Sequence, residues 1–169
     1  MFKSGFISII GKANVGKSTL LNALVNQKIS ITSPKPQTTR NKINGIVTTK
    51  DYQLVFTDTP GFHKPKTKLG EKMIKSVDDA IAGVDSCLFV TESKGEIRPT
   101  EIELLERLKK EKISVILAIN KIDKPAANPD KIKEGLAQMN FLVEEWGGKY
   151  QSQDISAKQG IGVDELLEK

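Results

Sequence analysis

Residues 11–18, GKANVGKS, have the types and spacing of a phosphate-binding loop, G-x-x-x-x-G-K-[ST]. Glycines let backbone N–H groups converge on phosphate oxygens, and the positive end of a following helix dipole attracts the same anion. Lys17 would neutralise charge on the β- and γ-phosphates, and the Ser18 hydroxyl is a suitable ligand for Mg²⁺. We therefore expect this loop to bind a nucleoside triphosphate together with Mg²⁺.

Residues 58–61, DTPG, are a second candidate segment for the same chemistry. Asp58 would lie at the carboxyl end of a strand, near the phosphates, where it can hold Mg²⁺ through water. The N–H of Gly61 is available to the γ-phosphate because no side chain obstructs it, and its torsional freedom lets the loop move after hydrolysis. DTPG alone is also typical of an ordinary turn, so this assignment depends on the loop at 11–18.

Two later segments could read the base. Asp123, at the end of the sequence NKID, can accept hydrogen bonds from both N1–H and the exocyclic amine of guanine, a donor pair that adenine lacks. A site of this kind rejects analogues without the partner groups by roughly 10⁴–10⁵-fold. Residues 156–158, SAK, would place the Ala157 N–H near guanine O6, although this tripeptide has little weight by itself. Together the two segments favour GTP over ATP.

The elements that must position these loops alternate along the chain. Short apolar runs, typical of buried strands, occur at 5–11, 53–58, 86–91 and 115–120. Helical spacing occurs at 16–26, and charged amphipathic stretches occur near 67–82, 99–110 and 128–140. Residues 43–49 should form an antiparallel hairpin with the 53–58 strand. The pattern predicts an α/β, P-loop NTPase fold: a doubly wound, mostly parallel six-stranded sheet with one antiparallel edge strand and about five helices.

Composition sets further bounds. The chain has 169 residues, enough for a single domain, and its formal charge of +5 favours a polyanion or simply a solvated lysine-rich surface. Cys87 lies in an apolar run and is interpreted as a core residue, as expected in a reducing compartment. No apolar run approaches the roughly 20 residues that span a bilayer. We expect a soluble, cytoplasmic monomer without membrane insertion.

Four motifs in this order resemble those of the translation-factor-related GTPases over essentially the whole chain. Up to about residue 117 the chain resembles the Era family of bacterial ribosome-assembly GTPases, in the strings KSGF (3–6), KISI (28–31), PQTTRN (36–41) and DTPGFHKPK (58–66). From about residue 118 it is similar to bacterial translation initiation factor 2, in NKIDKP (120–125), ANPDK (127–131) and EEWGG (144–148). This mosaic favours an engineered chimera over a natural divergent protein.

The resemblance implies a GTP-binding domain with slow, Mg²⁺-dependent hydrolysis that acts as an Era-like switch in ribosome biogenesis. The alternative is a chimeric guanine-nucleotide-binding module with little or no turnover. Ras-like enzymes orient the attacking water with a glutamine just after the D-x-x-G segment, where this chain has Phe62. An apolar side chain cannot hold that water, so basal hydrolysis is expected to be slow.

The resemblance also assigns site residues. Thr39, with Thr38 as the fallback, is the candidate switch threonine that ligates Mg²⁺ beside Ser18 and Asp58, and the catalytic candidates are Lys17, Thr39 and Gly61. Asn14 matches an asparagine that helps to bind K⁺ in some relatives, or else makes a simple loop hydrogen bond. The candidate nucleotide-binding residues are Asn14, Val15, Gly16, Lys17, Ser18, Thr19, Asp58, Gly61, Asn120, Lys121, Asp123, Ser156, Ala157 and Lys158.

Era-family proteins normally continue into a KH-type domain that binds ribosomal RNA, whereas this sequence stops at Lys169. We therefore expect residues 1–169 to be a single GTPase domain with the KH-type domain absent. The sequence has neither a Gly-x-x-Gly clamp of the KH type nor an evident aromatic stacking platform. Beyond GTP and GDP, ribosomal RNA or the small ribosomal subunit should bind only weakly and in a salt-sensitive manner.

Overall fold

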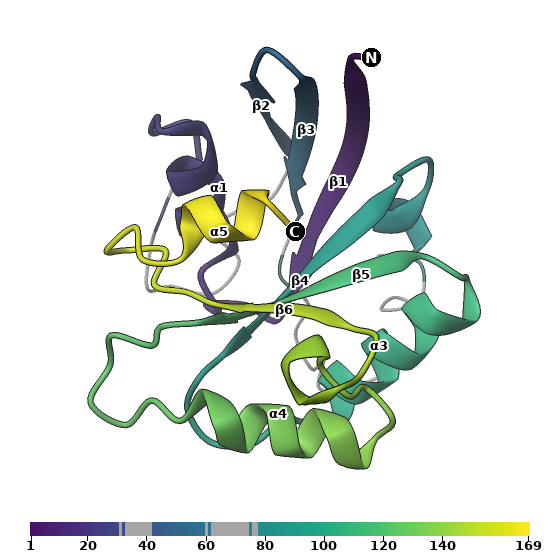
Figure 1. The fold of residues 1–169 in the computed structure, drawn as a ribbon, viewed down its shortest axis with the longest axis vertical. Helices are drawn as coiled ribbons and strands as arrows, with labels where there is room; N and C mark the ends of the chain where they lie inside the picture. The colour runs from purple at the N-terminus through teal and green to yellow at the C-terminus, as the bar shows by residue number, and fades with distance from the viewer. Residues whose placement is uncertain (31, 33–41, 60, 62–74, 76–77) are drawn as a thin grey trace.

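A twisted six-stranded sheet with the order β2-β3-β1-β4-β5-β6 forms the centre of the molecule (Figure 1). The computed structural model describes residues 1–30, 32, 42–59, 61, 75 and 78–169. The strands are β1 (Lys3–Gly11), β2 (Ile43–Thr48), β3 (Tyr52–Asp58), β4 (Ser86–Glu92), β5 (Ser114–Asn120) and β6 (Gln151–Asp154). Only β2 is antiparallel to its neighbour, β3, and it lies at the edge. The predicted sheet is therefore confirmed.

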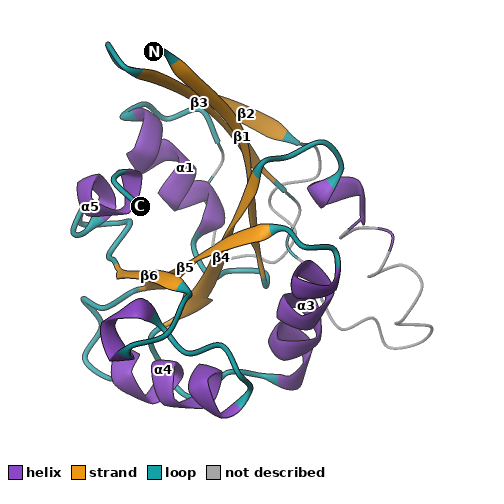
Figure 2. Cartoon of the chain, turned by 45° about the vertical axis from the view of Figure 1, so that its right-hand side comes forward, coloured by secondary structure: helices purple, strands orange, loops and turns teal. Residues whose placement is uncertain are grey.

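Helices cover both faces of this sheet (Figure 2). They are α1 (Lys17–Val25), α3 (Pro99–Lys110), α4 (Pro129–Gln138) and α5 (Val163–Leu167), with a short 3₁₀ helix, η1 (Glu144–Trp146). Helices α1 and α5 pack on one face, and α3 and α4 pack on the other. Residues 75 and 78–81 are also helical, but most of the helix expected near 67–82 lies outside the described residues.

Successive side chains of a central strand point to opposite faces of the sheet, which explains why both faces of the sheet are apolar. In β4, Leu88 and Val90 face the α1–α5 layer, whereas Cys87 and Phe89 face the α3–α4 layer. All four side chains are nearly or completely buried. Burial raises the pKa of the Cys87 thiol to about 12, so this cysteine behaves as a core residue, as the sequence indicated.

The parallel arrangement gathers the candidate loops. Strands β1, β3, β4, β5 and β6 all run in the same direction, so their carboxyl ends meet at one edge of the sheet. The segments that follow β1, β3, β5 and β6 are 11–18, 58–61, 120–123 and 156–158. Every motif that the sequence selected therefore starts from the same edge. Among the described helices, none has the length and apolar character needed to cross a membrane.

Candidate nucleotide-binding site

The loop at 11–18 joins β1 to α1 in a tight bend that requires glycine. Gly16 has φ 103°, and a Cβ there would lie 2.2 Å from the Asn120 side-chain nitrogen. A Cβ on Gly11 would lie 2.5 Å from the Val90 carbonyl oxygen. Val15 is buried within the bend, and Thr19 is half-buried in the first turn of α1. The loop thus presents the amino end of α1 at the carboxyl edge of the sheet, as a phosphate site requires.

Lys17 is the buried cation of this loop. Its side chain is almost inaccessible, and Nζ donates a hydrogen bond of 2.8 Å to the Lys12 carbonyl oxygen. Burial lowers its pKa to about 8, although the negative charge of Asp58 opposes that shift. A phosphate group bound here would favour the ammonium form and raise this pKa again.

The Lys17 pKa predicts how triphosphate affinity depends on pH. Because the free protein loses the Lys17 proton near pH 8 whereas the complex retains it, GTP affinity should weaken about fourfold from about pH 6.5 to about pH 8.5. Fluorescence titrations across this range measure the effect. A Lys17→Met variant should bind more weakly and with a flat profile. A pH dependence that persists in that variant would assign the titration to another group.

Oxygen donors of the kind that Mg²⁺ prefers lie together beside Lys17. The Ser18 hydroxyl donates a hydrogen bond of 2.5 Å to Asp58 Oδ2, and the Ser30 hydroxyl donates one of 2.9 Å to the same oxygen. Asp58 is completely buried at the end of β3. A hydroxyl next to a carboxylate is a suitable donor set for Mg²⁺. Thr39, the third predicted ligand, lies outside the described residues.

Gly61 lies directly against the phosphate loop. A Cβ at this position would lie 2.7 Å from Ala13 Cα and 2.9 Å from Lys17 Nζ, so a larger residue would displace the loop. Thr59, which the sequence analysis did not select, is buried and donates a hydrogen bond of 2.7 Å to the Ile9 carbonyl oxygen. This bond fixes the start of the 58–61 segment to β1.

The base-reading segment 120–123 is joined physically to the phosphate loop. Asn120 donates from Nδ2 to the Val15 carbonyl oxygen at 2.8 Å, and Lys121 Nζ donates to the Asn14 carbonyl oxygen at 2.6 Å. Lys121 also forms an ion pair with Glu92 at the end of β4. The sequence analysis did not select Glu92. Its position as a carboxylate at the end of a buried strand is the signal that could have identified it. The loops after β1, β4 and β5 thus form one unit.

The segment 156–158 completes this unit from the β6 side. The Ser156 hydroxyl donates a hydrogen bond of 2.7 Å to Asp123 Oδ1, and this bond lowers the pKa of Asp123, which keeps the exposed carboxylate ionised. The Ala157 N–H donates to Asn120 Oδ1 at 3.0 Å. This is the N–H expected to donate to guanine O6. On guanine binding it would have to donate to both acceptors or exchange Asn120 Oδ1 for guanine O6. Lys158 is exposed beside them.

Residues 6–121 match the family model described as 50S ribosome-binding GTPase. The chain is 46% identical to GTPase Era of Clostridium acetobutylicum over 171 positions, which cover 99% of this chain and 55% of that protein. It is 48% identical to GTPase Era of Clostridium tetani over 172 positions, with the same two coverages. The chain therefore spans about half the length of these curated relatives.

A crystal structure of Era in complex with MgGDPNP and nucleotides 1506–1542 of 16S ribosomal RNA is also similar to this chain. The TM-score is 0.81 at 34% identity, over 99% of this chain and 56% of that one. Since the Era alignments cover 99% of the chain, the likeness does not end near residue 117. These comparisons give no support to an initiation-factor-2 segment or to an engineered chimera.

Proposed function

We propose that this chain, which belongs to the family of 50S ribosome-binding GTPases, binds GTP with Mg²⁺ and hydrolyses it slowly as an Era-like switch. One observation carries the proposal. Asn120 and Lys121, at the base-reading end, donate hydrogen bonds directly to the carbonyl oxygens of Val15 and Asn14 in the phosphate loop. Two loops in contact can share one nucleotide, with its phosphates on 11–18 and its guanine at Asp123.

Each residue has a chemical task in this proposal. Ser18, Asp58 and Thr39 would hold Mg²⁺, which would supply charge neutralisation at the phosphates when bound. Lys17 adds a second positive charge that is already desolvated, and such a charge interacts strongly with the negative charge that develops during phosphoryl transfer. The N–H of Gly61 donates to the γ-phosphate. When the γ-phosphate is lost this hydrogen bond is lost, and the loop at Gly61 can move. Asp123 accepts hydrogen bonds from guanine.

Slow turnover is expected from the residue that follows Gly61 in the sequence, Phe62, which lies outside the described residues. Phe62 occupies the position where Ras-like enzymes have a glutamine that orients the attacking water, and its side chain cannot form that hydrogen bond. We propose that water alignment depends on a switch-loop group, an external partner or a K⁺ ion near Asn14. The alternative is a guanine-nucleotide-binding module with almost no turnover.

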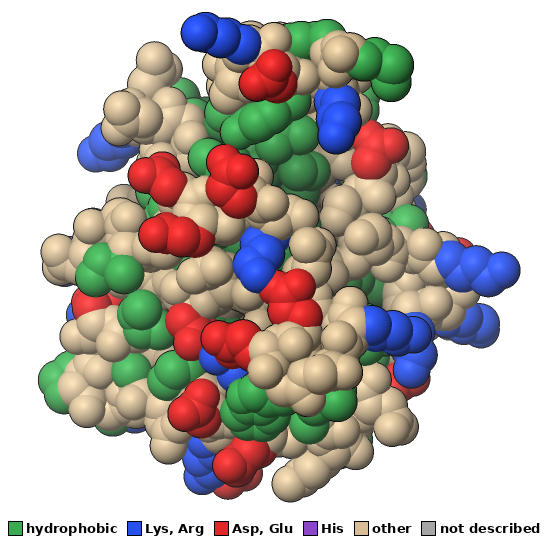
Figure 3. Space-filling model, viewed as in Figure 1, with side chains coloured by type: hydrophobic (Ala, Val, Ile, Leu, Met, Phe, Trp, Pro, Cys, Tyr) green, Lys and Arg blue, Asp and Glu red, His purple; other side chains and the backbone are tan. Residues whose placement is uncertain are grey.

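The proposal extends to RNA only in a weak form. We propose that residues 1–169 constitute one G domain in a cytoplasmic, monomeric protein, and that these residues contact ribosomal RNA weakly. The face drawn in Figure 3 has acidic side chains interspersed with basic ones over α4, α5 and β6, which does not favour a phosphate backbone. The related Era structure that contains 16S ribosomal RNA supports RNA as the partner class.

Single-turnover phosphate release separates the GTPase from the binding module. With GTP and Mg²⁺ we expect a rate constant at or below about 10⁻³ s⁻¹, comparable with unassisted Ras-like enzymes. Chelation of Mg²⁺ should abolish release, and replacement of Na⁺ by K⁺ should accelerate it if Asn14 helps to hold a cation. Release of phosphate at the same rate in an Asp58→Asn variant would contradict the proposed site. Bound GTP that stays intact under every condition would favour the binding module.

A further inference from the structure

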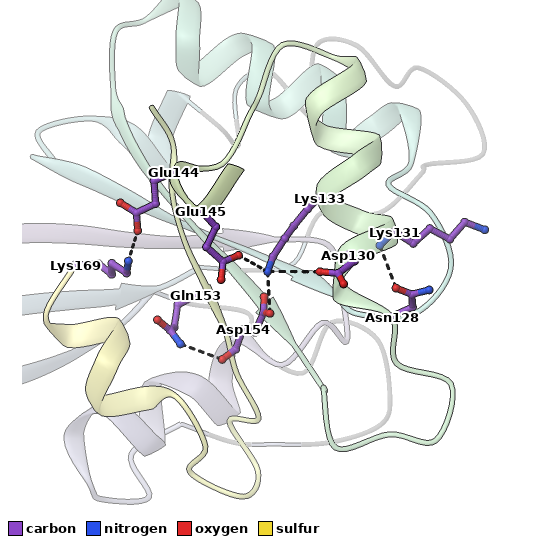
Figure 4. A network of polar contacts seen from close by, with 9 residues as sticks. All are labelled: Asn128, Asp130, Lys131, Lys133, Glu144, Glu145, Gln153, Asp154 and Lys169. Carbon is purple, nitrogen blue, oxygen red and sulfur yellow. Dashed lines mark hydrogen bonds and ion pairs between the residues drawn. The ribbon is translucent and has the colours of Figure 1, made fainter. Parts of the chain in front are cut away.

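An ion network around the buried Lys133 joins α4, η1 and β6 (Figure 4). Lys133, in the middle of α4, donates hydrogen bonds from Nζ to Glu145 of η1 at 2.6 Å and to Asp154 of β6 at 2.9 Å. Asp130, one turn earlier in α4, approaches the same ammonium at 4.0 Å. The Lys133 side chain is only 4% exposed. Three consecutive elements, α4, η1 and β6, therefore share one buried charge.

Lys133 remains charged in this position. Burial lowers the pKa of Lys133, but hydrogen bonds to Glu145 and Asp154 raise it, and the net shift is upward. On the carboxylate side, Asp154 Oδ1 is buried and has no hydrogen-bond partner among the described residues. Asp154 therefore depends on Lys133 for compensation of its charge. Removal of Lys133 would leave the partly buried Asp154 charge uncompensated, which destabilises the structure around it.

The two ends of this ion pair lie on elements that adjoin the two base-reading segments. Helix α4 follows the 120–123 segment after a short connection, and the Asn128 N–H at its start donates to the Ser93 carbonyl oxygen at 2.6 Å. Asp154 is the last residue of β6 and comes just before 156–158. Lys133 thus links α4, the helix that follows the 120–123 segment, to β6, the strand that precedes the 156–158 segment.

Strand β6 is a short edge strand to which this link adds support. It has four residues, lies at the edge of the sheet and, among the described strands, pairs with β5. The backbone beyond it must nevertheless hold Ser156 within 2.7 Å of Asp123. The backbone after β6 is also held at Ile155, whose N–H donates to the Ile119 carbonyl oxygen at 2.8 Å and whose carbonyl oxygen accepts from the Ile122 N–H at 3.2 Å. The ion pair adds a side-chain link one residue earlier, at the end of β6.

We propose that Lys133 is a positioning residue for guanine recognition: through its ion pair with Asp154 it holds residues 156–158 in place, so that Ser156 keeps Asp123 aligned with the base. The proposal rests on the guanine-nucleotide site described under the proposed function. It concerns only the base end of that site, because Lys133 has no contact with the phosphate loop among the described residues.

The test compares GDP with ADP, which has the same phosphates and ribose but lacks the groups that Asp123 reads. In a Lys133→Met variant, GDP affinity should fall about tenfold, the effect of losing one buried charged contact, while ADP affinity should change less than twofold. Competition against a fluorescent GDP analogue measures both, and release of that analogue should be faster. Equal weakening for GDP and ADP would mean a general structural role and would overturn the proposal.

Two further variants separate positioning from stability. Lys131→Met removes a neighbouring lysine of α4 whose ion pair with Glu96 is exposed, and its GDP affinity should match that of the unmodified chain. The double variant Lys133→Met/Asp154→Asn removes both charges of this ion pair, so thermal stability should recover while GDP release stays fast. Recovery of GDP affinity together with stability would contradict the proposal. Absence of a GDP preference in the unmodified chain would instead refute the proposed function.

Discussion

An Asp123→Asn variant is expected to bind xanthosine diphosphate in preference to GDP. The Asp123 carboxylate is exposed, ionised and held by the Ser156 hydroxyl, so it can accept from the N1–H and the amine of guanine. An asparagine amide can instead donate to the carbonyl oxygen that xanthine has in place of that amine. We expect GDP affinity to fall on the order of 10³-fold. This loss is smaller than the discrimination that fully buried hydrogen-bonding sites reach, because Asp123 is exposed. Competition titrations with both diphosphates measure the reversal.

The Asp123→Asn variant should retain its fold. The asparagine side-chain oxygen can still accept the hydrogen bond from Ser156, so the 156–158 segment keeps its anchor. Thermal unfolding and circular dichroism are the controls. An intact variant that still prefers GDP would show that Asp123 does not read the base, and guanine selectivity would then have to come from elsewhere.

A Lys17→Met variant is expected to lose GTP affinity and turnover, each on the order of 10²–10³-fold, the size of effect seen when one preorganised charge-stabilising donor is removed. Lys17 is buried beside Asp58 at the start of α1, where its charge has little solvent screening. Equilibrium titration and single-turnover phosphate release measure the two losses separately.

Stability provides the control for Lys17→Met. The folded state lowers the Lys17 pKa below the value of the unfolded chain, so the ammonium form disfavours the ligand-free fold at neutral pH. Methionine has a similar length and no charge, and the ligand-free variant should therefore unfold at the same or a higher temperature. A variant that is stable and binds GTP normally would exclude Lys17 from the phosphate site.

Most of the architecture could be predicted because two independent signals agreed. Apolar runs gave the positions of β1, β3, β4 and β5, and the motifs came directly after three of these strands, where a parallel sheet must gather them. The antiparallel placement of β2 followed from its short connection to β3. Residue spacing and strand polarity together therefore bring the candidate segments to one edge of the predicted sheet.

The residues that the sequence did not reveal act through single tertiary contacts. Ser30 donates to Asp58 and Lys133 reaches Asp154, yet neither pair has a spacing that marks it in advance. Glu92, which pairs with Lys121, has only its place at the end of β4 as a signal. A buried lysine in an amphipathic helix looks like an ordinary solvated one until its partners are located. The sequence assigns the Ala157 N–H to guanine O6, and the structure adds that this N–H also has an acceptor in Asn120 Oδ1.

A crystal structure of the chain with Mg²⁺ and a non-hydrolysable GTP analogue tests the central claim most directly. The account predicts one nucleotide, with its β- and γ-phosphates against the amides of residues 11–18 and Lys17 Nζ, and with its guanine edge at Asp123 Oδ1 and Oδ2. The same structure would contradict the account if the triphosphate lay on the loop while the base pointed away from Asp123, or if the nucleotide bound elsewhere.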